Sequence, residues 1–527
     1  MASKSPFQFL VLPRELRDDI YVYYLTLEGG YVFNYESGKL VTANSDTSPI
    51  DLALMYTCTV VADEMKGLAL RENCITLYPV TSAELRVRAA RFHALLQDVL
   101  RLERGLLQDD YDYNNDPHED VPPRYNQHVV DQVSRISPHA GFLLQVHLDH
   151  DTYCLHYEYP YGIARSEMRQ ALHHAVQLTL DQDLFAQPQK AEAQAILPVR
   201  RDIPPWAIPT EEDLERMSCL VHRDPDEFNQ GLAEFWSNSA SRSSGRSWHW
   251  HFVYGIYRFS AAAVAVHFLS SISPNTRQHI RQVKLCEDRK AVGNSECHAL
   301  GLIPFCQANT LMRIERRVNL WKNAFQKPRG PSKVNSRNGV HSLSASELII
   351  PWIAEAMALE PAGMPAESFN LVLDGDLAPE QCSEIWQTRQ REVVSQKARQ
   401  DLQRRKLVRN TEYLDGESEL HWGCFSPCGF HGMEKALDDI ANGTSVVRCN
   451  FPLPPRIYAD EIIANAISLG SEWWYQWRDQ DWNRSFDEYH EPDPPNPGWT
   501  ELLKDNILPE FFERYPTFVK EGFREFR

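Results

Sequence analysis

The 527-residue sequence lacks the short motifs that mark the common enzyme classes. It contains no G-x-G-x-x-G, no Walker A loop, no H-E-x-x-H, no G-x-S-x-G and no C-x2-C pair. Paired carboxylates are uninformative here, because a chain with 72 acidic residues offers many such pairs by chance. The sequence therefore has no strong catalytic signature, and it favours a protein that is not an enzyme.

Long apolar runs are also missing. Nowhere do about 18 uncharged apolar residues follow one another, so no membrane span is expected. The N-terminal stretch "MASKSPFQFL" contains no apolar segment long enough for a secretory signal. The 11 cysteines are odd in number and scattered. Without a signal peptide they are expected to be reduced thiols, which places the chain in the cytoplasm or nucleus.

Basic residues are in the minority. The chain has 54 Lys and Arg against 72 Asp and Glu, a formal net charge of −18. Broad nucleic-acid binding is not expected, because neutralising phosphates requires clustered Lys and Arg. Local basic patches remain compatible with this balance. The basic stretches 313–337 and 404–409 are compatible with a nuclear-import signal or a nucleic-acid contact, but a solvated helix face and a linker is the favoured interpretation.

The segment "FLVLPRELRDDIYVYYL", residues 9–25, predicts an amphipathic helix. Its apolar residues recur at i, i+4 intervals, and Pro13 suits the first helical position. Glu15 then lies in the first turn, where the helix dipole favours a carboxylate. The apolar stripe comprises Leu12, Leu16, Ile20 and Tyr24, with Tyr23 and Leu27 on the same side, and the predicted wet face carries Arg14, Arg17, Asp18 and Asp19.

Three sequence blocks carry a family resemblance. They are Leu12-Pro13-x-Glu15-Leu16-x-x-x-Ile20-Tyr21, then Thr57-Cys58-x-x-x-Ala62-Asp63-Glu64, then Asn73-Cys74-Ile75-Thr76-Leu77. Together they resemble the F-box-like module found at the N-terminus of many filamentous-fungal proteins, a largely uncharacterised family. The match covers about residues 7–80. The resemblance implies that Leu12, Pro13, Leu16 and Ile20 contact a Skp-type adaptor of a ubiquitin ligase.

Two departures from an ordinary F-box leave a second interpretation open. Arg17 stands where a hydrophobic residue is usual, and a predicted hairpin around Glu36-Ser37-Gly38 separates the first helix from the second. With this insertion, the apolar face of the first helix can be buried within the chain's own core. The two departures favour that intramolecular role over adaptor docking.

The remainder predicts a helix-rich α+β fold, in which a helix–hairpin–helix F-box-like unit packs on a larger mixed body. Helices are expected at 51–73, 83–107, 165–183, 258–271 and 379–407, and strands at 74–80 and 369–376. Residues 141–160 alternate like two strands, and the apolar spacing of 311–325 is helical. The predicted units are an F-box-like unit (1–80), a central α+β body (81–325), a basic linker (326–345) and a Trp-rich C-terminal region (346–527).

One cluster is a candidate metal site. "HWGCFSPCGFH" places His421, Cys424, Cys428 and His431 as H-x2-C-x3-C-x2-H, and zinc prefers four such ligands in a tetrahedron. All four ligands within so short a loop are cramped, and an aromatic, Gly-containing loop explains the same residues. Asp374 and Asp376 follow an apolar strand and suit either a divalent cation or an Asp-Gly turn. "ECH" (296–298) sets a Cys beside a His in sequence.

Three functions stay open on the sequence alone. The first is an interaction protein that joins a Skp-type adaptor to an unknown protein target. The second is a fungal scaffold with no link to a ligase. The third is a metal-binding enzyme that uses the 421–431 His/Cys cluster.

Overall fold

Seven short segments pair into one β-sheet, in the order β2-β1-β3-β4-β5-β7-β8. The computed structural model describes residues 9–43, 50–108, 123–150, 164–221, 255–325, 340–404, 432–469, 488–489, 501 and 504–514. The hairpin of β1 and β2 is antiparallel, and every other neighbouring pair is parallel. The strands are β1 (Tyr31–Asn34), β2 (Lys39–Thr42), β3 (Cys74–Leu77), β4 (Gln282–Glu287), β5 (Arg313–Asn319), β7 (Phe369–Asp374) and β8 (Val447–Cys449).

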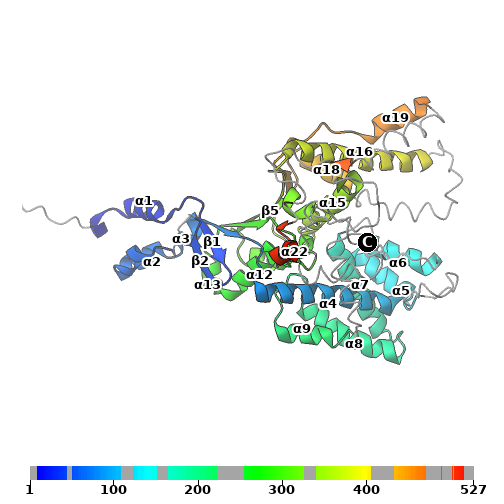
Figure 1. Cartoon of the computed structure of the whole chain (residues 1–527), viewed down its shortest axis with the longest axis horizontal. Coiled ribbons are helices and arrows are strands. Elements are labelled where there is room, and N and C mark those ends of the chain that lie inside the picture. The colour runs from blue at the N-terminus through cyan, green and yellow to red at the C-terminus, as the bar shows by residue number, and fades with distance from the viewer. Residues whose placement is uncertain are drawn as a thin grey trace, which may run out of the picture.

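The parallel strands follow one another across the sheet in chain order, so the helical connections gather on one face (Figure 1). Side chains in β4 and β5 alternate accordingly. Leu285 and Val318 are buried under helices, whereas Lys284 and Glu315 lie partly exposed on the opposite face. The connections nearest the sheet are α12 (Ala261–Ser271), α13 (Pro274–Arg277), η3 (Ser295–Leu302), α14 (Ile303–Ala308), η4 (Leu320–Ala324), α15 (Ser342–Ala358), α16 (Pro379–Arg404) and α18 (Met433–Ala441).

A helical layer between β3 and β4 has its own apolar core. Ser82 accepts a hydrogen bond from the Leu85 amide and so begins its longest helix. Thr210 and Asp213 form a capping box at its last helix. The layer comprises α4 (Ala83–Leu107), α5 (Gln127–Ile136), α6 (Pro138–His150), α7 (Arg165–Asp181), α8 (Gln187–Asp202) and α9 (Glu211–Ser218).

The remaining elements lie outside this layer. They are α19 (Ala459–Leu469), α22 (Pro509–Arg514) and the strand pair of β6 (Val340–His341) with β9 (Glu488–Tyr489).

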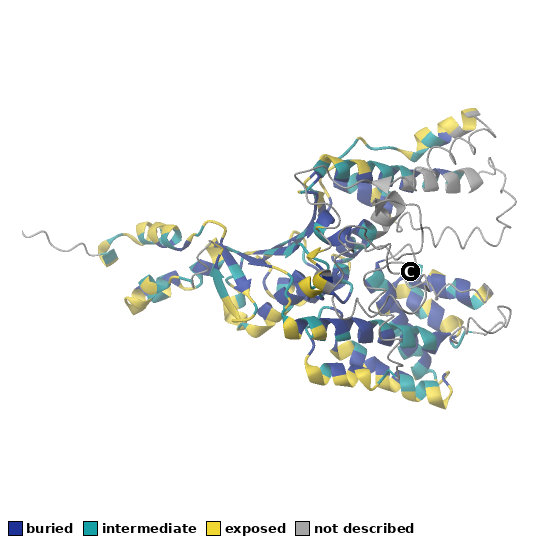
Figure 2. Ribbon diagram, in the orientation of Figure 1, coloured by how far each residue is buried: buried dark blue, intermediate teal, exposed yellow. Residues whose placement is uncertain are grey.

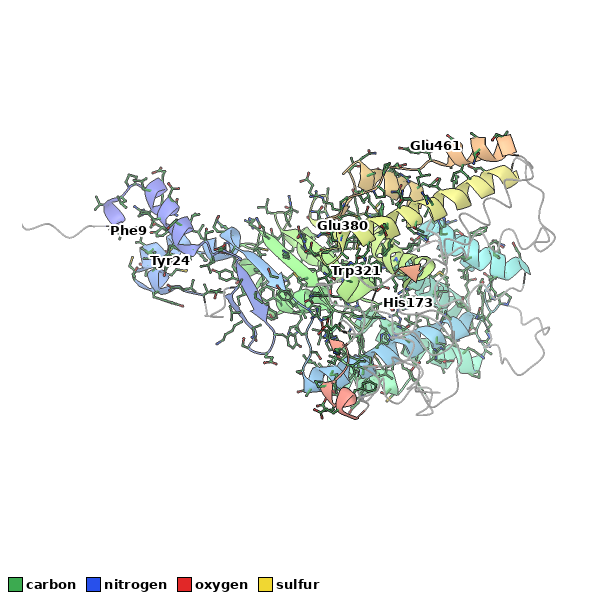
Figure 3. The ribbon with its side chains drawn as sticks, turned by 45° about the horizontal axis from the view of Figure 1, so that its top comes forward. Phe9, Tyr24, His173, Trp321, Glu380 and Glu461 are labelled. Carbon is green, nitrogen blue, oxygen red and sulfur yellow. The ribbon has the colours of Figure 1, made fainter. Side chains whose placement is uncertain are left out.

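The N-terminal helices form a small head that projects from one end of the molecule (Figure 1). It has a separate core that includes Tyr21, Leu25, Tyr31, Val61 and Met65. Figure 3 shows Phe9 and Tyr24 on this head and Trp321 within the body. The head consists of η1 (Phe9–Val11), α1 (Arg14–Leu25), η2 (Ala53–Tyr56), α2 (Thr59–Met65) and α3 (Leu68–Glu72), with the β1–β2 hairpin between α1 and η2.

The structure confirms the helix-rich α+β class and most of the predicted elements. The helix at 83–107 has the predicted bounds, the hairpin lies where it was predicted, and the strand predicted at 369–376 ends at Asp374. The predicted helix 51–73 is divided into η2, α2 and α3, and Gly67 sits between the last two with a φ of +75°. The sheet takes strands from all three large predicted units, so the boundaries at 80 and 326 do not delimit separate sheets.

Two predictions of secondary structure were wrong. Residues 141–150 belong to α6 and are not a strand, so His147 is buried while Asp149 is exposed on another side of the helix. Residues 313–319 form β5 instead of a helix: Ile314, Arg316 and Val318 are buried on one face, and the residues between them are partly exposed. Helix α16 has a largely polar sequence, yet Trp386 and Val394 are among its buried residues.

Within the described residues, no helix combines the length and apolar character that crossing a bilayer requires.

Candidate functional site: the exposed face of the head

Helix α1 is fastened to α2 by an ion pair that involves Arg17. The Arg17 guanidinium donates to Glu64 through Nη2 at 2.6 Å and through Nε at 3.0 Å. Arg14 adds a third cationic contact, with its Nη1 3.0 Å from Glu64 Oε1. Only about a tenth of the Glu64 and Arg17 side chains remains exposed. Arg17 therefore does not lie on a wet face, as the sequence pattern predicted, but faces inward.

Tyr21 completes this contact. Its hydroxyl donates to Glu64 Oε2 at 2.7 Å, and the ring is fully buried. Hydrogen bonds from Arg17 and then Tyr21 lower the pKa of Glu64 to about 2. Burial, followed by the bond to Glu64, raises the pKa of Tyr21 to about 12. Both shifts keep the carboxylate charged and the phenol neutral over the physiological range.

Because Arg17, Tyr21 and Leu25 face the rest of the head, another side of α1 faces solvent. Leu16 is 50% exposed, Ile20 is 40% exposed and Tyr23 is 89% exposed. Their i, i+4, i+7 spacing places them on one stripe of the helix. The expectation that this stripe would be buried within the chain's own core was wrong, since Leu16 and Ile20 contact solvent. Figure 2 shows exposed residues along the helices of the head.

Exposed apolar side chains are concentrated in the head. In the part of the chain that the structure describes, seven of fifteen exposed large apolar residues lie between positions 10 and 60. Such concentrations mark interaction sites more often than do single exposed residues. The seven, named the exposed head residues, are Leu10, Val11, Leu16, Ile20, Tyr23, Tyr56 and Val60.

The four residues that the family resemblance implies for adaptor contact lie together at the start of α1. Pro13 is the N-cap residue and is exposed, and Leu12 is half-buried. The carbonyl of Leu12 accepts a hydrogen bond from Arg17 Nη1. Leu16 and Ile20 follow on the exposed stripe. Sequence reasoning placed Tyr23 on the same side as Leu16 and Ile20, but it missed the exposure of Tyr56, in η2, and of Val60, in α2.

The candidate zinc ligands His421, Cys424, Cys428 and His431 lie outside the described residues, as does most of the Trp-rich segment. Among the residues that are described, no group of three or more His, Cys, Asp or Glu side chains is arranged to hold a metal ion.

Asp374 and Asp376 form a turn that is closed by an amide. Asn450 Nδ2 donates to both carboxylates, at 2.6 and 2.5 Å, and its Oδ1 accepts from the Gly375 amide at 2.8 Å. Burial and then the charge of Asp374 raise the pKa of Asp376. Arg317 approaches Asp374 at 3.4 Å from the next strand. The arrangement corresponds to the Asp-Gly turn of the two interpretations offered by the sequence.

Cys297 and His298 are structural. Burial raises the pKa of the Cys297 thiol to about 12 and lowers the pKa of His298 to about 3. The His298 Nε2–H points at the Gly293 carbonyl, 3.1 Å away, so its Nδ1 accepts from the Ser260 hydroxyl at 2.7 Å. All three side chains are buried. They have no access to a substrate and serve to order the start of α12.

A second buried group lies on the helix-covered face of the sheet. Glu287 Oε1 accepts from Arg316 Nε at 3.0 Å, from Arg316 Nη2 at 2.6 Å and from the Ala262 amide at 3.2 Å. Its Oε2 accepts from the Ala261 amide at 3.1 Å. Arg316 also lies 4.7 Å from the centre of the Trp352 ring. The pair thus joins two strands to the beginning of α12, and no open cavity separates its members.

Within the described residues, the head is therefore the region in which exposed apolar side chains are most concentrated. Comparison of the chain with protein-family models, with curated proteins and with solved structures gave no match.

Proposed function

We propose that this chain is an interaction protein that docks a Skp-type adaptor of a ubiquitin ligase through the exposed stripe of α1, while its body holds a protein target. The observation that carries the proposal is the outward position of Leu16, Ile20 and Tyr23. An amphipathic helix commonly binds a partner by laying such i, i+4, i+7 anchors into a groove.

The inward pairing of Arg17 supports this proposal. In the sequence, Arg17 was the main objection to an adaptor-binding helix. Since its guanidinium bonds Glu64 and two backbone carbonyls, Arg17 is turned away from the apolar stripe, and an exposed carboxylate, Asp19, borders the stripe instead. The same contacts fix the orientation of α1, which lowers the ordering cost of binding.

The test uses the full chain and a purified Skp-type adaptor in isothermal titration calorimetry. We expect the Leu16→Glu/Ile20→Glu variant to bind at least about a hundredfold more weakly, because central apolar anchors typically contribute about 2 kcal/mol each. Both positions are exposed, so circular dichroism should show an intact fold. Val87→Glu is the matched control, since Val87 is exposed on α4, away from the head.

Two results would count against adaptor docking. One is wild-type protein that does not bind the adaptor at all, which would leave the scaffold without a ligase link. The other is equal affinity for wild type and Leu16→Glu/Ile20→Glu, which would place the contact elsewhere.

A further inference from the structure

The amino ends of strands β3, β4 and β5 carry a group of cations. Parallel strands begin at one edge of a sheet, so residues that precede them lie together. Arg281 immediately precedes β4, and Arg313 is the first residue of β5. Arg71 belongs to α3, which leads into β3. The group, named the basic edge, consists of Lys66, Arg71, Arg277, Arg281 and Arg313.

Hydrogen bonds show that the basic edge is continuous. The Arg313 amide donates to the Arg281 carbonyl at 2.7 Å. The Arg71 Nη2 atom lies 3.1 Å from His279 Nδ1, and His279 is two residues before Arg281. Figure 1 places α3 and α13 at the same end of the sheet, near the β1–β2 hairpin. Three neighbouring strands span about 10 Å, so the cations at their amino ends lie within reach of one short ligand.

Neutral groups hold the arginine side chains in place. Arg281 Nη1 donates to the carbonyls of Gln278, at 2.7 Å, and Ile280, at 3.0 Å. Arg313 Nη1 donates likewise to Thr310, at 2.7 Å, and Met312. The Arg277 guanidinium lies 5.3 Å from the centre of the Phe305 ring. Because these contacts orient the guanidinium groups without neutralising them, their remaining N–H groups stay available for an anion.

Counter-charge is scarce around the basic edge. Among the described residues, the one carboxylate within ion-pair distance of any member is Glu367, 3.9 Å from Arg313 Nη2 and itself 85% exposed. Burial, followed by the charges of Arg71, Arg281 and Lys66, lowers the pKa of His279. A positive group of this kind is notable in a chain whose net charge is −18. The edge is thus an attractive site for anions on a molecule that otherwise repels them.

We propose that the basic edge binds a short acidic segment of a protein partner. Arginine side chains match carboxylates in bidentate geometry, and Leu311, 57% exposed beside Arg313, offers an apolar contact that a peptide side chain can use. A width of about 10 Å suits a few residues of extended peptide. A long nucleic acid would extend beyond the basic edge and be repelled by the rest of the chain, whose net charge is negative.

The test measures fluorescence anisotropy of a labelled peptide of about twelve residues, made of Glu and Asp around one Leu, with the full chain. A peptide with Gln and Asn in place of the acids is the uncharged probe. We expect Arg281→Gln/Arg313→Gln to weaken binding of the acidic peptide about tenfold at low salt. The loss should shrink at high salt, because the Debye length falls.

Two further variants separate charge from position. Arg201→Gln/Lys435→Gln removes the same net charge at two exposed sites elsewhere and should leave the affinity within about twofold. Lys66→Gln/Arg71→Gln changes two exposed residues of the basic edge, and should weaken binding even if Arg281→Gln/Arg313→Gln lowers the thermal stability.

This proposal is independent of adaptor docking, since Leu16→Glu/Ile20→Glu should bind the acidic peptide as wild type does. Equal binding of the acidic and uncharged peptides, no detectable binding, or equal losses in the edge and control variants would overturn it. An oligothymidine that competes at lower concentration than the acidic peptide, with the same dependence on Arg281 and Arg313, would assign the edge to nucleic acid and also overturn it.

Discussion

Replacing Glu287 by glutamine tests whether the buried pair with Arg316 holds the sheet to α12. The substitution keeps the size of the side chain and removes its charge. Every partner of the Glu287 carboxylate is a donor: two N–H groups of Arg316 and the amides of Ala261 and Ala262. Either orientation of a glutamine amide therefore directs its NH₂ group at a donor.

The expected loss follows from burial. Glu287 is 0% and Arg316 is 1% exposed, so neither charge can be compensated by water. Removing one member of a buried pair costs about 3–5 kcal/mol, because the other charge is left uncompensated. Glutamine retains one acceptor oxygen. We therefore expect Glu287→Gln to lower the free energy of unfolding by about 3 kcal/mol.

The assay is urea unfolding followed by tryptophan fluorescence, since Trp321 and Trp352 lie in the same core. Glu315→Gln is the control. Glu315 occupies the partly exposed face of β5, 3.5 Å from Arg317, and its neutralisation should cost less than about 1 kcal/mol. A loss for Glu287→Gln no larger than that of the control would refute the reasoning, because it would show that the buried pair adds nothing to the stability of the sheet.

Three other predictions concern thiols, a turn and acid. At pH 8 an alkylating reagent should modify the exposed Cys58 well before Cys297, because burial raises the pKa of the Cys297 thiol to about 12. Mass spectrometry of the labelled peptides measures the order of modification. Early labelling of Cys297 would contradict the buried arrangement. Gly30→Ala should lower the free energy of unfolding by more than about 2 kcal/mol, because φ at this position is +68° and the new Cβ would lie 2.3 Å from the Cys74 carbonyl oxygen. Gly38→Ala is the control, since Gly38 has a similar φ of +65° but open space around it, and it should cost about 1 kcal/mol. Equal losses in thermal unfolding of the two variants would show that the close contact is irrelevant. The folded-state pKa of Glu64 is about 2 against an ordinary 4.5, so its contribution to the contact between α1 and α2 is present above pH 4.5 and is lost as the pH falls towards 2. Pepsin should then cut the head of the wild type increasingly over that range but cut Glu64→Gln throughout it, and pH-independent cutting of the wild type would contradict this assignment.

Local sequence rules predicted those elements whose stability is largely local. Ser82 and the apolar repeat of 83–107 specify α4, and Thr210 with Asp213 specifies the start of α9. The β1–β2 hairpin follows from two apolar runs around Gly38. In each case the deciding interactions join residues only a few positions apart, so the sequence contains them directly.

The failures arose where distant partners decide the structure. In 311–325 the apolar positions fit a helix, because the buried Arg316 was counted as polar surface. Its partner Glu287 lies 29 residues earlier in the chain, and the pair lets an arginine occupy a core position of a strand. The parallel order of the sheet was equally hidden, since the connection between β3 and β4 contains an entire helical layer.

The head shows the same limit at the candidate site. Leu16 and Ile20 were identified from the sequence, but their exposure depends on which side of α1 faces inward. An apolar count favours burying Leu12, Leu16 and Ile20. The structure instead buries Tyr21 and Leu25, because Arg17 and Tyr21 find one carboxylate, Glu64, 47 and 43 residues away. Charge pairing thus rotates the helix relative to the hydrophobic expectation, and it leaves Leu16 and Ile20 exposed on the surface of the head.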